Sequence, residues 1–494
     1  MKVEALPKKE RLLVSQLRDF VDNDSGYSVA LIAGIRQTGK TTILQQLKEF
    51  YYHDAVYIDL SVGGTDIHTI EEQFLDDPTS LLLLDEISYL DDYEQYAQLI
   101  YNLTAGEYNR KFKVIITGSS AAHVVKLRSN KLGGGRAKLF RLPPIMFVEY
   151  LYFTDRIASY MDYDNVKPED FEDYLFLKGL DDRLSIQFDD DYFESFYDEI
   201  DVSNERRCIS TSFVGLKSGD LSVLTNLLAY KLSESSSYDT TIQPKVGGQE
   251  HIHLANLGMK VKKSRIDLSN SIIADSKVAA PHINTSDIGR ILLFLLYSGL
   301  AQLEQLEQND EDKTDTGRVL AVLNRSNRDE LEHLFDTVSI CMASPLFYTR
   351  LGSEIMKMKG VDPDVLRKGM LFGKMLELYV RGGLALKSSS TILTSKKLNY
   401  TDSSETDIGE VDIWADRHML LCELGTDSKK DNQLNLRKYF KEAGIIRIGS
   451  SRTKEYFTGE HHRIPYAKLC CMVDTGDIFK LEKTVIQDLD KENG

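Results

Sequence analysis

Apolar residues in the first 120 positions gather into three short runs that lack polar alternation. The runs are YSVALIA at 27–33, LLLL at 81–84 and VIIT at 114–117. A strand whose side chains are apolar on both faces is typical of a parallel sheet that helices cover on both sides. The segment TILQQLKEF at 42–50 follows the first run and predicts a helix. The pattern therefore predicts an α/β fold with a parallel sheet in this part of the chain.

Helical periodicity dominates the middle of the chain. Helical patches such as FEDYLFLKGL recur between 151 and about 220, and leucines at 221, 224, 228 and 232 form one stripe. A later segment, TSDIGRILLFLLYSGLAQLEQLE, offers Thr285 as an N-cap and Asp287 in the first turn. We expect a helix there, followed by Gly299 and an apolar strand.

The C-terminal third alternates helix and strand patterns. MLFGKMLELYV at 370–380 predicts an amphipathic helix. EVDIWA at 410–415 and MLLCELG at 419–425 predict two strands, with a short turn at Asp416-Arg417 between them. This part is therefore expected to contain a β-hairpin in an α/β domain.

Composition sets the broad class. The chain has 494 residues, of which 42% are hydrophobic and 28% charged, as in soluble globular proteins with two to four domains. No apolar run approaches the roughly 20 residues of a membrane helix, and MKVEALPKKERLL at the start has no apolar signal core. The five cysteines are scattered without a CxxC pair, so no disulfide scaffold or zinc ribbon is indicated. We expect a cytoplasmic protein without a membrane segment.

Charge is distributed unevenly. The net charge is −16, but residues 160–200 carry 14 acidic against three basic residues and supply most of it. That run is a solvated face between helices or an acidic strip that binds a partner. Residues 345–470 carry 21 basic against 16 acidic residues, a net of +5. Because steering depends on local potential, DNA binding by the C-terminal part is not excluded.

The motif GIRQTGKT spans Gly34–Thr41 and fits the phosphate-binding pattern G-x-x-x-x-G-K-[ST]. Its place between a buried strand and a helix is the context that this loop requires, which argues against a chance match. Lys40 is expected to reach the β- and γ-phosphates of ATP, and Thr41 to hold Mg²⁺. The expected nucleotide-binding residues are Gly34, Gln37, Thr38, Gly39, Lys40, Thr41 and Thr42.

Two acids follow the second apolar run. Asp85 would lie at the carboxyl end of its strand, where parallel sheets bind ligands, and would hold the Mg²⁺ shell. Glu86 would polarise the attacking water. Hydroxyls at 117–120 end the third run, and Ser119 is the chosen γ-phosphate sensor. An ordinary strand end is the alternative for the two acids taken alone.

Arg136 follows three glycines in an expected exposed loop. A cation there could act as an arginine finger, toward its own nucleotide or that of a neighbouring subunit. A surface arginine is the alternative.

Four segments together carry a resemblance: GIRQTGKTTIL, LLLLDEIS, ITGSS and GGGRAKLFRLPPIMFVEYL, in that order. They resemble a family of prokaryotic AAA-type P-loop ATPases that joins this module to a winged-helix region and a C-terminal domain similar to PD-(D/E)xK nucleases. The resemblance implies an ATPase domain at 1–155, a helical and winged-helix region at 156–340 and a nuclease-like domain at 341–494. The winged helix would contact DNA, pack internally or bind a partner protein.

In the nuclease-like fold, the hairpin would bring Asp412 and Glu423 together to bind Mg²⁺, with Glu377 completing the shell. The family pattern requires a lysine two residues after the second acid, and this sequence has Gly425 there. Lys429, Lys430 and Gln433 lie just downstream and could replace it. The alternative is a binding fold that does not cut.

The sequence therefore predicts a Mg²⁺-dependent ATPase, and two function classes stay open beyond ATP turnover. In one, the C-terminal domain cuts DNA or RNA, for example in defence against foreign DNA. In the other, the protein is a nucleotide-controlled switch whose inactive C-terminal domain binds DNA or a partner protein. ATP and Mg²⁺ are the expected cofactors, and a homo-oligomer is one possible assembly.

Overall fold

The computed structural model describes two compact units of the chain. The described residues are 6–24, 26–34, 38–62, 81–87, 93–105, 112–118, 124, 127, 137–175, 178–180, 301–305, 338–342, 376, 379–380, 382–384, 386–387, 393–397, 410–415, 420–424, 446–453, 455–458 and 461–481. The first unit holds the described residues up to Pro144, and the second holds those from Ile145 onward.

A parallel sheet forms the centre of the first unit. Its strands are β1 (Val29–Ala33), β2 (Ala55–Asp59), β3 (Leu81–Asp85), β4 (Lys113–Thr117) and β5 (Ala137–Arg141). They follow the order β2-β3-β4-β1-β5, and every pair is parallel. All residues of β1 and β3 are buried, as expected of strands without polar alternation. The predicted parallel α/β sheet is thus confirmed.

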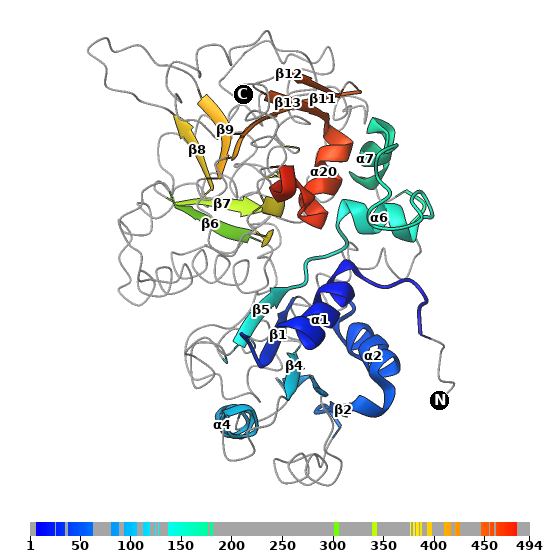
Figure 1. Ribbon diagram of the computed structural model, residues 1–494, viewed down its shortest axis with the longest axis vertical. Coiled ribbons are helices and arrows are strands. Elements are labelled where there is room, and N and C mark those ends of the chain that lie inside the picture. Colours follow the sequence, from blue (N-terminus) through cyan, green and yellow to red (C-terminus); the bar gives the residue numbers. More distant parts are fainter. Residues whose placement is uncertain are drawn as a thin grey trace, which may run out of the picture. The chain divides into compact units, whose positions relative to one another are not determined.

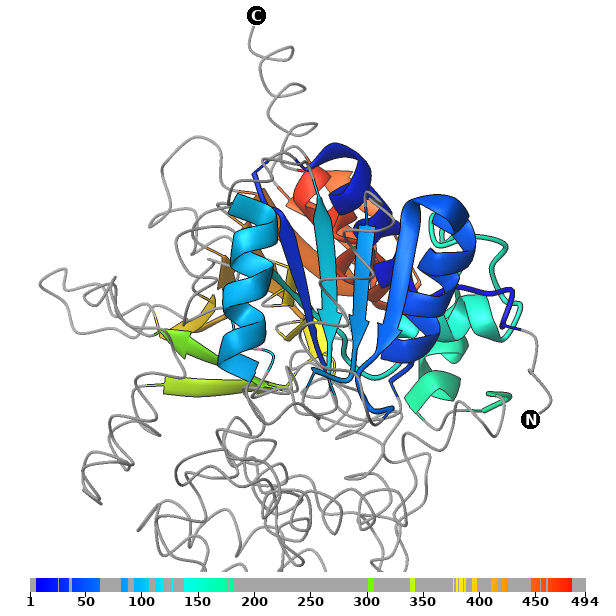
Figure 2. The same cartoon turned by 90° about the horizontal axis from the view of Figure 1, so that it is seen from below.

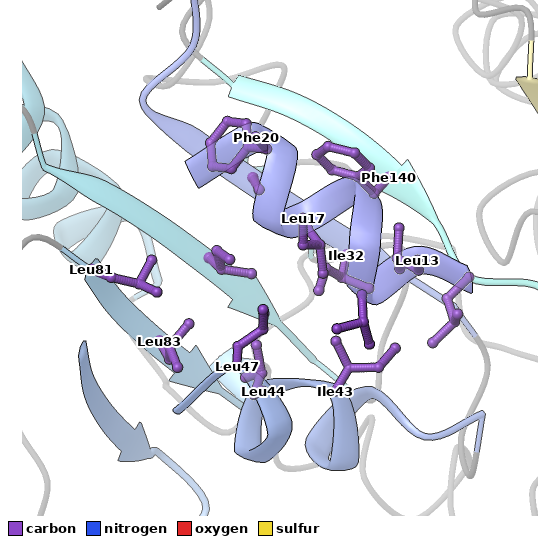
Figure 3. Close-up of a cluster of buried hydrophobic side chains, with 14 of the residues drawn as sticks. Leu13, Leu17, Phe20, Ile32, Ile43, Leu44, Leu47, Leu81, Leu83 and Phe140 are labelled. Carbon is purple, nitrogen blue, oxygen red and sulfur yellow. The ribbon is translucent and has the colours of Figure 1, made fainter. Parts of the chain in front are cut away.

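Helices cover both faces of this sheet (Figure 2). Helices α1 (Leu12–Asn23) and α2 (Lys40–Tyr51) lie on one face, and α4 (Tyr93–Ala105) lies on the other. A short 3₁₀ turn, η1 (Tyr52–Asp54), joins α2 to β2. Leucines and phenylalanines from α1, α2 and the strands meet in the core on the first face (Figure 3).

Side-chain alternation decides which strand residues face α2. Leu81 and Leu83 of β3 and Ile115 of β4 belong to the core beneath α1 and α2. Because side chains alternate along a strand, Asp85 and Thr117 project from the same face. Both lie at the carboxyl ends of their strands, beside the start of α2.

The second unit contains a helical core. Its helices are α6 (Phe147–Phe153), α7 (Pro168–Leu175) and α20 (Tyr466–Thr475), followed by the 3₁₀ turn η5 (Asp477–Lys480). Described residues between 376 and 387 are also helical, in agreement with the helix predicted at 370–380. Aromatic rings from α6, α7, α20 and the helical residues at 376–387 pack together. The centroid of the Phe171 ring lies 5.0–5.9 Å from those of Phe147, Tyr379 and Tyr466.

A mixed six-stranded sheet accompanies these helices. Its strands are β8 (Leu393–Lys397), β9 (Glu410–Ala415), β10 (Leu420–Glu423), β11 (Ile446–Ser451), β12 (Tyr456–Thr458) and β13 (His461–Pro465), in the order β12-β13-β11-β10-β9-β8. Strands β10, β11 and β13 are parallel, and β8, β9 and β12 run antiparallel to their neighbours. The predicted hairpin is confirmed, since β9 pairs antiparallel with β10.

The second unit also contains a separate two-stranded sheet, whose strands lie between α7 and β8 in the sequence. It pairs β6 (Ala301–Gln305) with β7 (Val338–Met342), antiparallel. Strand β6 matches the strand expected after Gly299. The preceding predicted helices, at 221–232 and after Thr285, fall outside the described residues. Of the expected region at 156–340, the structure describes 156–175, 178–180, 301–305 and 338–340. Figure 1 labels most of the helices and strands and colours them by their position in the sequence.

No helix in the described stretches has both the length and the apolar character that a membrane span needs.

Candidate functional site

The predicted phosphate loop joins β1 to α2. Gly34 follows the last residue of β1, Gly39 is the N-cap of α2, and Lys40 is its first residue. The carbonyl of Gly39 accepts the first helical hydrogen bond, from the amide of Ile43 at 2.9 Å. The loop thus ends at a helix N-terminus, whose free N–H groups and positive dipole end favour phosphate. Gln37, with residues 35 and 36, lies outside the described part of the loop.

The two loop glycines are required for different physical reasons. Gly39 has a φ of +90°, in the left-handed region that L side chains rarely adopt, although a Cβ there would meet no atom within 4 Å. Gly34 lies so close to the next strand that a Cβ would come within 2.5 Å of the carbonyl oxygen of Leu142. Backbone conformation therefore requires a glycine at position 39, and the nearby Leu142 backbone requires one at position 34.

Lys40 folds back over the loop that precedes it. Its Nζ donates to the carbonyl oxygen of Gly34 at 3.0 Å, and the residue is only 6% exposed. The ammonium is therefore held against the backbone of the first loop residue. Thr41 is exposed and Thr42 is half-buried in the first turn of α2.

Asp85 is the buried carboxylate of this site, with 1% exposure. Its Oδ2 accepts a hydrogen bond from the hydroxyl of Tyr57 at 3.0 Å, and its Oδ1 accepts one from the hydroxyl of Thr117. The amide of Glu86 also donates to Oδ1, at 3.0 Å. Neighbours on β2 and β4 therefore hold both carboxylate oxygens in place.

The Tyr57 hydroxyl is fixed as a donor in this arrangement. Burial raises the pKa of Tyr57, and the negative charge of Asp85 raises it further. The phenol therefore stays protonated throughout the physiological range and keeps donating to the carboxylate.

Glu86 leaves the strand in an unusual backbone conformation. Its φ is +58°, one of three positive values at non-glycine residues in the described part of the chain. Such a conformation costs on the order of 1–2 kcal/mol for an L residue and often occurs at functional sites. The turn places half-buried Glu86 directly after Asp85 at the carboxyl edge of the sheet.

Sequence reasoning missed Arg11, which precedes α1. Its Nη1 donates to the carbonyl of Thr38 at 2.7 Å, and its Nη2 donates to the carbonyl of Pro143 at 2.8 Å. Nothing in the sequence marks this arginine, because its two acceptors lie 27 and 132 positions away. Tyr57 was missed for the same reason. Thr117 belongs to the hydroxyl group at 117–120 that the sequence indicated, and its bond to Asp85 gives it a place in the site.

Several predicted site residues lie outside the described part of the chain. They are Ser119, Arg136, Glu377, Lys429, Lys430 and Gln433, together with Gly425. Asp412 lies on β9 and Glu423 on β10. The hairpin register ends where Cys422 pairs with Ile413, so Glu423 and Asp412 each lie one residue beyond this last pair.

The residues at the first site suit a magnesium ion chemically. Mg²⁺ prefers oxygen ligands and is usually bound by one or two carboxylates together with substrate phosphates. Asp85 supplies a buried carboxylate, and Thr41 supplies a hydroxyl at the start of α2. Within the described ranges, no three His, Cys, Asp or Glu side chains gather into a metal-binding group. A magnesium ion here would therefore depend on the nucleotide for further ligands.

Comparison with known proteins agrees with this geometry. Residues 26–151 match a family model described as an AAA domain. These residues run from the start of β1 to α6 and include the phosphate loop, Asp85 and Glu86. The N-terminal region is therefore an AAA-type P-loop ATPase domain with a parallel α/β sheet.

Similar solved structures include a DNA replication initiation factor, with 12% identity over 67% of this chain and 97% of that chain. DnaA from Aquifex aeolicus bound to AMPPCP has 13% identity over 58% and 88%, and ORC2 from Aeropyrum pernix has 11% over 67% and 97%. Their TM-scores are 0.25, 0.25 and 0.24, values at which nothing follows for this chain. No curated protein matches the sequence.

Proposed function

We propose that the N-terminal unit hydrolyses ATP to ADP and phosphate with Mg²⁺. The observation that carries the proposal is the meeting of three groups at one sheet edge. Lys40 begins the helix after β1, Asp85 ends β3, and the Thr117 hydroxyl at the end of β4 donates to Asp85. An ammonium at a helix N-terminus, a buried carboxylate and a hydroxyl that holds this carboxylate match what a nucleotide phosphate chain with Mg²⁺ requires.

Each residue then has a definite role. Amides at the start of α2 and the Lys40 ammonium bind the phosphates, and Thr41 and Asp85 hold Mg²⁺, which neutralises phosphate charge when bound. Glu86 orients a water in line with the γ-phosphorus and accepts its proton. Ser119 senses the γ-phosphate, and Arg136 stabilises the developing charge in its own subunit or in a neighbour.

The test is a pair of substitutions with different expected effects. Lys40→Ala removes the charge that meets the β- and γ-phosphates, so it should abolish tight ATP binding. Glu86→Gln keeps every phosphate contact but cannot accept a proton, so it should bind ATP and lose turnover by about 100-fold or more. Calorimetry with ATP and a phosphate-release assay measure the two properties separately. Wild-type turnover in the Glu86 variant would contradict the assigned role.

We further propose the division into an ATPase domain at 1–155, a helical and winged-helix region at 156–340 and a nuclease-like domain at 341–494. The β9–β10 pairing supports the last part, since Asp412 and Glu423 adjoin the last paired positions, Ile413 and Cys422. Two carboxylates on paired strands would bind a divalent cation that polarises a phosphodiester. DNA or RNA is the proposed substrate, or the bound partner if Gly425 makes the domain inactive.

A metal titration of the full chain tests this second proposal. Asp412→Asn combined with Glu423→Gln should remove a Mn²⁺-binding event that the Lys40→Ala chain retains. Cleavage of single- and double-stranded DNA, measured on the same chains, separates a nuclease from a binding domain. Equal metal binding by the wild type and the double variant would mean that these acids have no metal-binding role.

A further inference from the structure

Arg11 donates hydrogen bonds to two segments of the first unit that lie far apart in the sequence, the phosphate loop and the segment after β5. One guanidinium nitrogen donates to the carbonyl of Thr38, which immediately precedes Gly39 and Lys40. Another donates to the carbonyl of Pro143, which immediately follows the last residue paired with the end of β1. Arg11 is 8% exposed, so both bonds lie in a largely desolvated place. Hydrogen bonds from a buried charge are among the stronger ones in proteins.

The Arg11 backbone is itself firmly anchored. Arg11 is the N-cap of α1, and its carbonyl accepts the amide of Val14 at 2.9 Å. Val14 and Leu17 of this helix are fully buried in the core between α1, α2 and the sheet, and Figure 3 shows Leu17 there. The guanidinium therefore projects from a rigid element toward two loops, which suits a group that sets their positions.

Leu142 also contacts the end of β1 and the first residue of the phosphate loop. The amide of Leu142 donates to the carbonyl of Ala33 at 2.8 Å and extends the ladder by one bond beyond β5. The carbonyl of Leu142 is the atom that a Cβ at Gly34 would meet at 2.5 Å. Pro143 and Pro144 then end the ladder, because neither has an N–H to donate.

These contacts have a consequence at the exit from the unit. The chain leaves the first unit at Pro144, directly after the residues that contact the loop. The loop thus meets this segment at two places, through the close approach of Gly34 to the Leu142 carbonyl and through the Arg11 bonds to Thr38 and Pro143.

We infer that Arg11 is a positioning residue that couples the nucleotide site to this exit segment. Arg11 holds the Thr38–Gly39 backbone in the shape that presents amides to phosphate, and it ties that shape to the position of Pro143. Nucleotide binding should then stabilise the bonded position of Leu142 and Pro143. That position should favour nucleotide binding in return, since linkage acts equally in both directions. The inference rests on the proposed ATP site and adds its regulation.

Binding measurements on the full chain test the positioning role. Arg11→Gln should weaken Mg²⁺-ADP binding by about tenfold or more, the equivalent of about 1.4 kcal/mol or more, because charge-assisted bonds that hold the loop are lost. Arg11→Lys should lose less ADP affinity than Arg11→Gln, because the ammonium keeps the charge. It should still bind more weakly than the wild type, because an ammonium lacks the fork that reaches two carbonyls. Arg18→Gln is the matched control on the same helix, since Arg18 contacts Glu10 and the Phe50 ring instead. It should bind ADP like the wild type.

Amide hydrogen exchange of the wild type tests the coupling and needs no variant. Mg²⁺-ADP should slow exchange at Leu142 several-fold more than at Val114, whose amide bonds Ser28 at the opposite end of the sheet. Arg11→Lys should reduce that difference, which a purely structural role would not do. Equal effects at both amides overturn the coupling, even if Arg11→Gln fails to fold.

The outcomes also separate this inference from the proposed ATP site. ADP binding that is lost in Lys40→Ala but unchanged in Arg11→Gln would leave the ATP site standing and overturn the role of Arg11. If the wild type binds no nucleotide, both fall together.

Discussion

At the scale of single residues, backbone conformation constrains the candidate site as strongly as side-chain chemistry does. Gly39, Gly34 and Glu86 each occupy a position that an ordinary residue would find strained or too close to its neighbours. The first two permit the loop to wrap a phosphate chain. At Glu86, the fold tolerates strain at a carboxylate whose proposed role needs that position.

Substitutions of the two glycines should therefore differ in kind. Gly39→Asn should retain more ADP affinity than Gly39→Ala, because asparagine tolerates the left-handed region better than alanine does. Gly34→Ala should instead lower the free energy of unfolding by about 1–3 kcal/mol without nucleotide, since its Cβ overlaps the Leu142 carbonyl. Thermal unfolding and calorimetry check the two effects. Equal loss for both substitutions at Gly39 would mean that φ is not the limiting factor there.

At the scale of elements, one tyrosine connects three helical segments of the second unit. The Tyr379 hydroxyl donates to the Asp474 carboxylate of α20 at 2.8 Å and accepts the amide of Phe147 at the start of α6 at 3.0 Å. Asp474 also accepts the amide of Val148 at 3.0 Å. Gly383 permits this close approach, because a Cβ there would come within 2.4 Å of Val473.

Tyr379→Phe should consequently destabilise the second unit by about 1–3 kcal/mol, because it leaves a buried amide and a buried carboxylate short of a partner. Tyr174→Phe is a suitable control, since the neighbouring hydroxyl donates to the single carbonyl of Ile145 at 2.9 Å. Urea unfolding of both variants gives the comparison. An equal or larger loss in the control would show that the Tyr379 hydroxyl does not hold α6 to α20.

At the scale of the whole molecule, the same cluster should make stability depend on pH. Burial raises the pKa of Asp474 to about 7, although bonds from Val148 and Tyr379 and the charge of Lys387 lower it. The folded state therefore binds a proton between pH 4 and 7 that the unfolded state has released. It follows that the contribution of Asp474 to stability is largest at low pH and decreases as pH rises toward 7.

Asp474→Asn should reveal this contribution, because asparagine cannot ionise. The free energy of unfolding of the wild type minus that of Asp474→Asn should fall between pH 5 and pH 8, by up to about 1.4 kcal/mol per unit below pH 7. Asp477→Asn provides a control of opposite sign. Burial acts to raise the pKa of Asp477, but hydrogen bonds from Lys480, Tyr163 and Thr475 outweigh it and lower that pKa.

The Asp477 contribution is therefore present above pH 4 and lost on acidification, so its difference should rise between pH 2 and pH 5. Denaturant titrations at fixed pH values measure both differences. A flat difference for Asp474→Asn from pH 5 to pH 8 would mean that Asp474 does not take up a proton on folding.

The sequence by itself determined the local features of this protein. Unbroken apolar runs predicted β1, β3 and β4, and the spacing of Gly34, Gly39 and Lys40 located the phosphate loop and the start of α2. Two strand-like segments separated by a short turn predicted the β9–β10 hairpin. These features depend on residues a few positions apart, so local propensity and burial on both strand faces suffice to specify them.

Only the tertiary structure decided which distant residues complete each site. Tyr57 and Asp85 are 28 positions apart, Arg11 and Pro143 are 132 apart, and Val148 and Asp474 are 326 apart. No periodicity encodes such pairs, because they form when separate elements pack and their buried polar groups need partners. The strand order places β3 between β2 and β4, and so a tyrosine from β2 and a threonine from β4, rather than further acids, hold Asp85 in place.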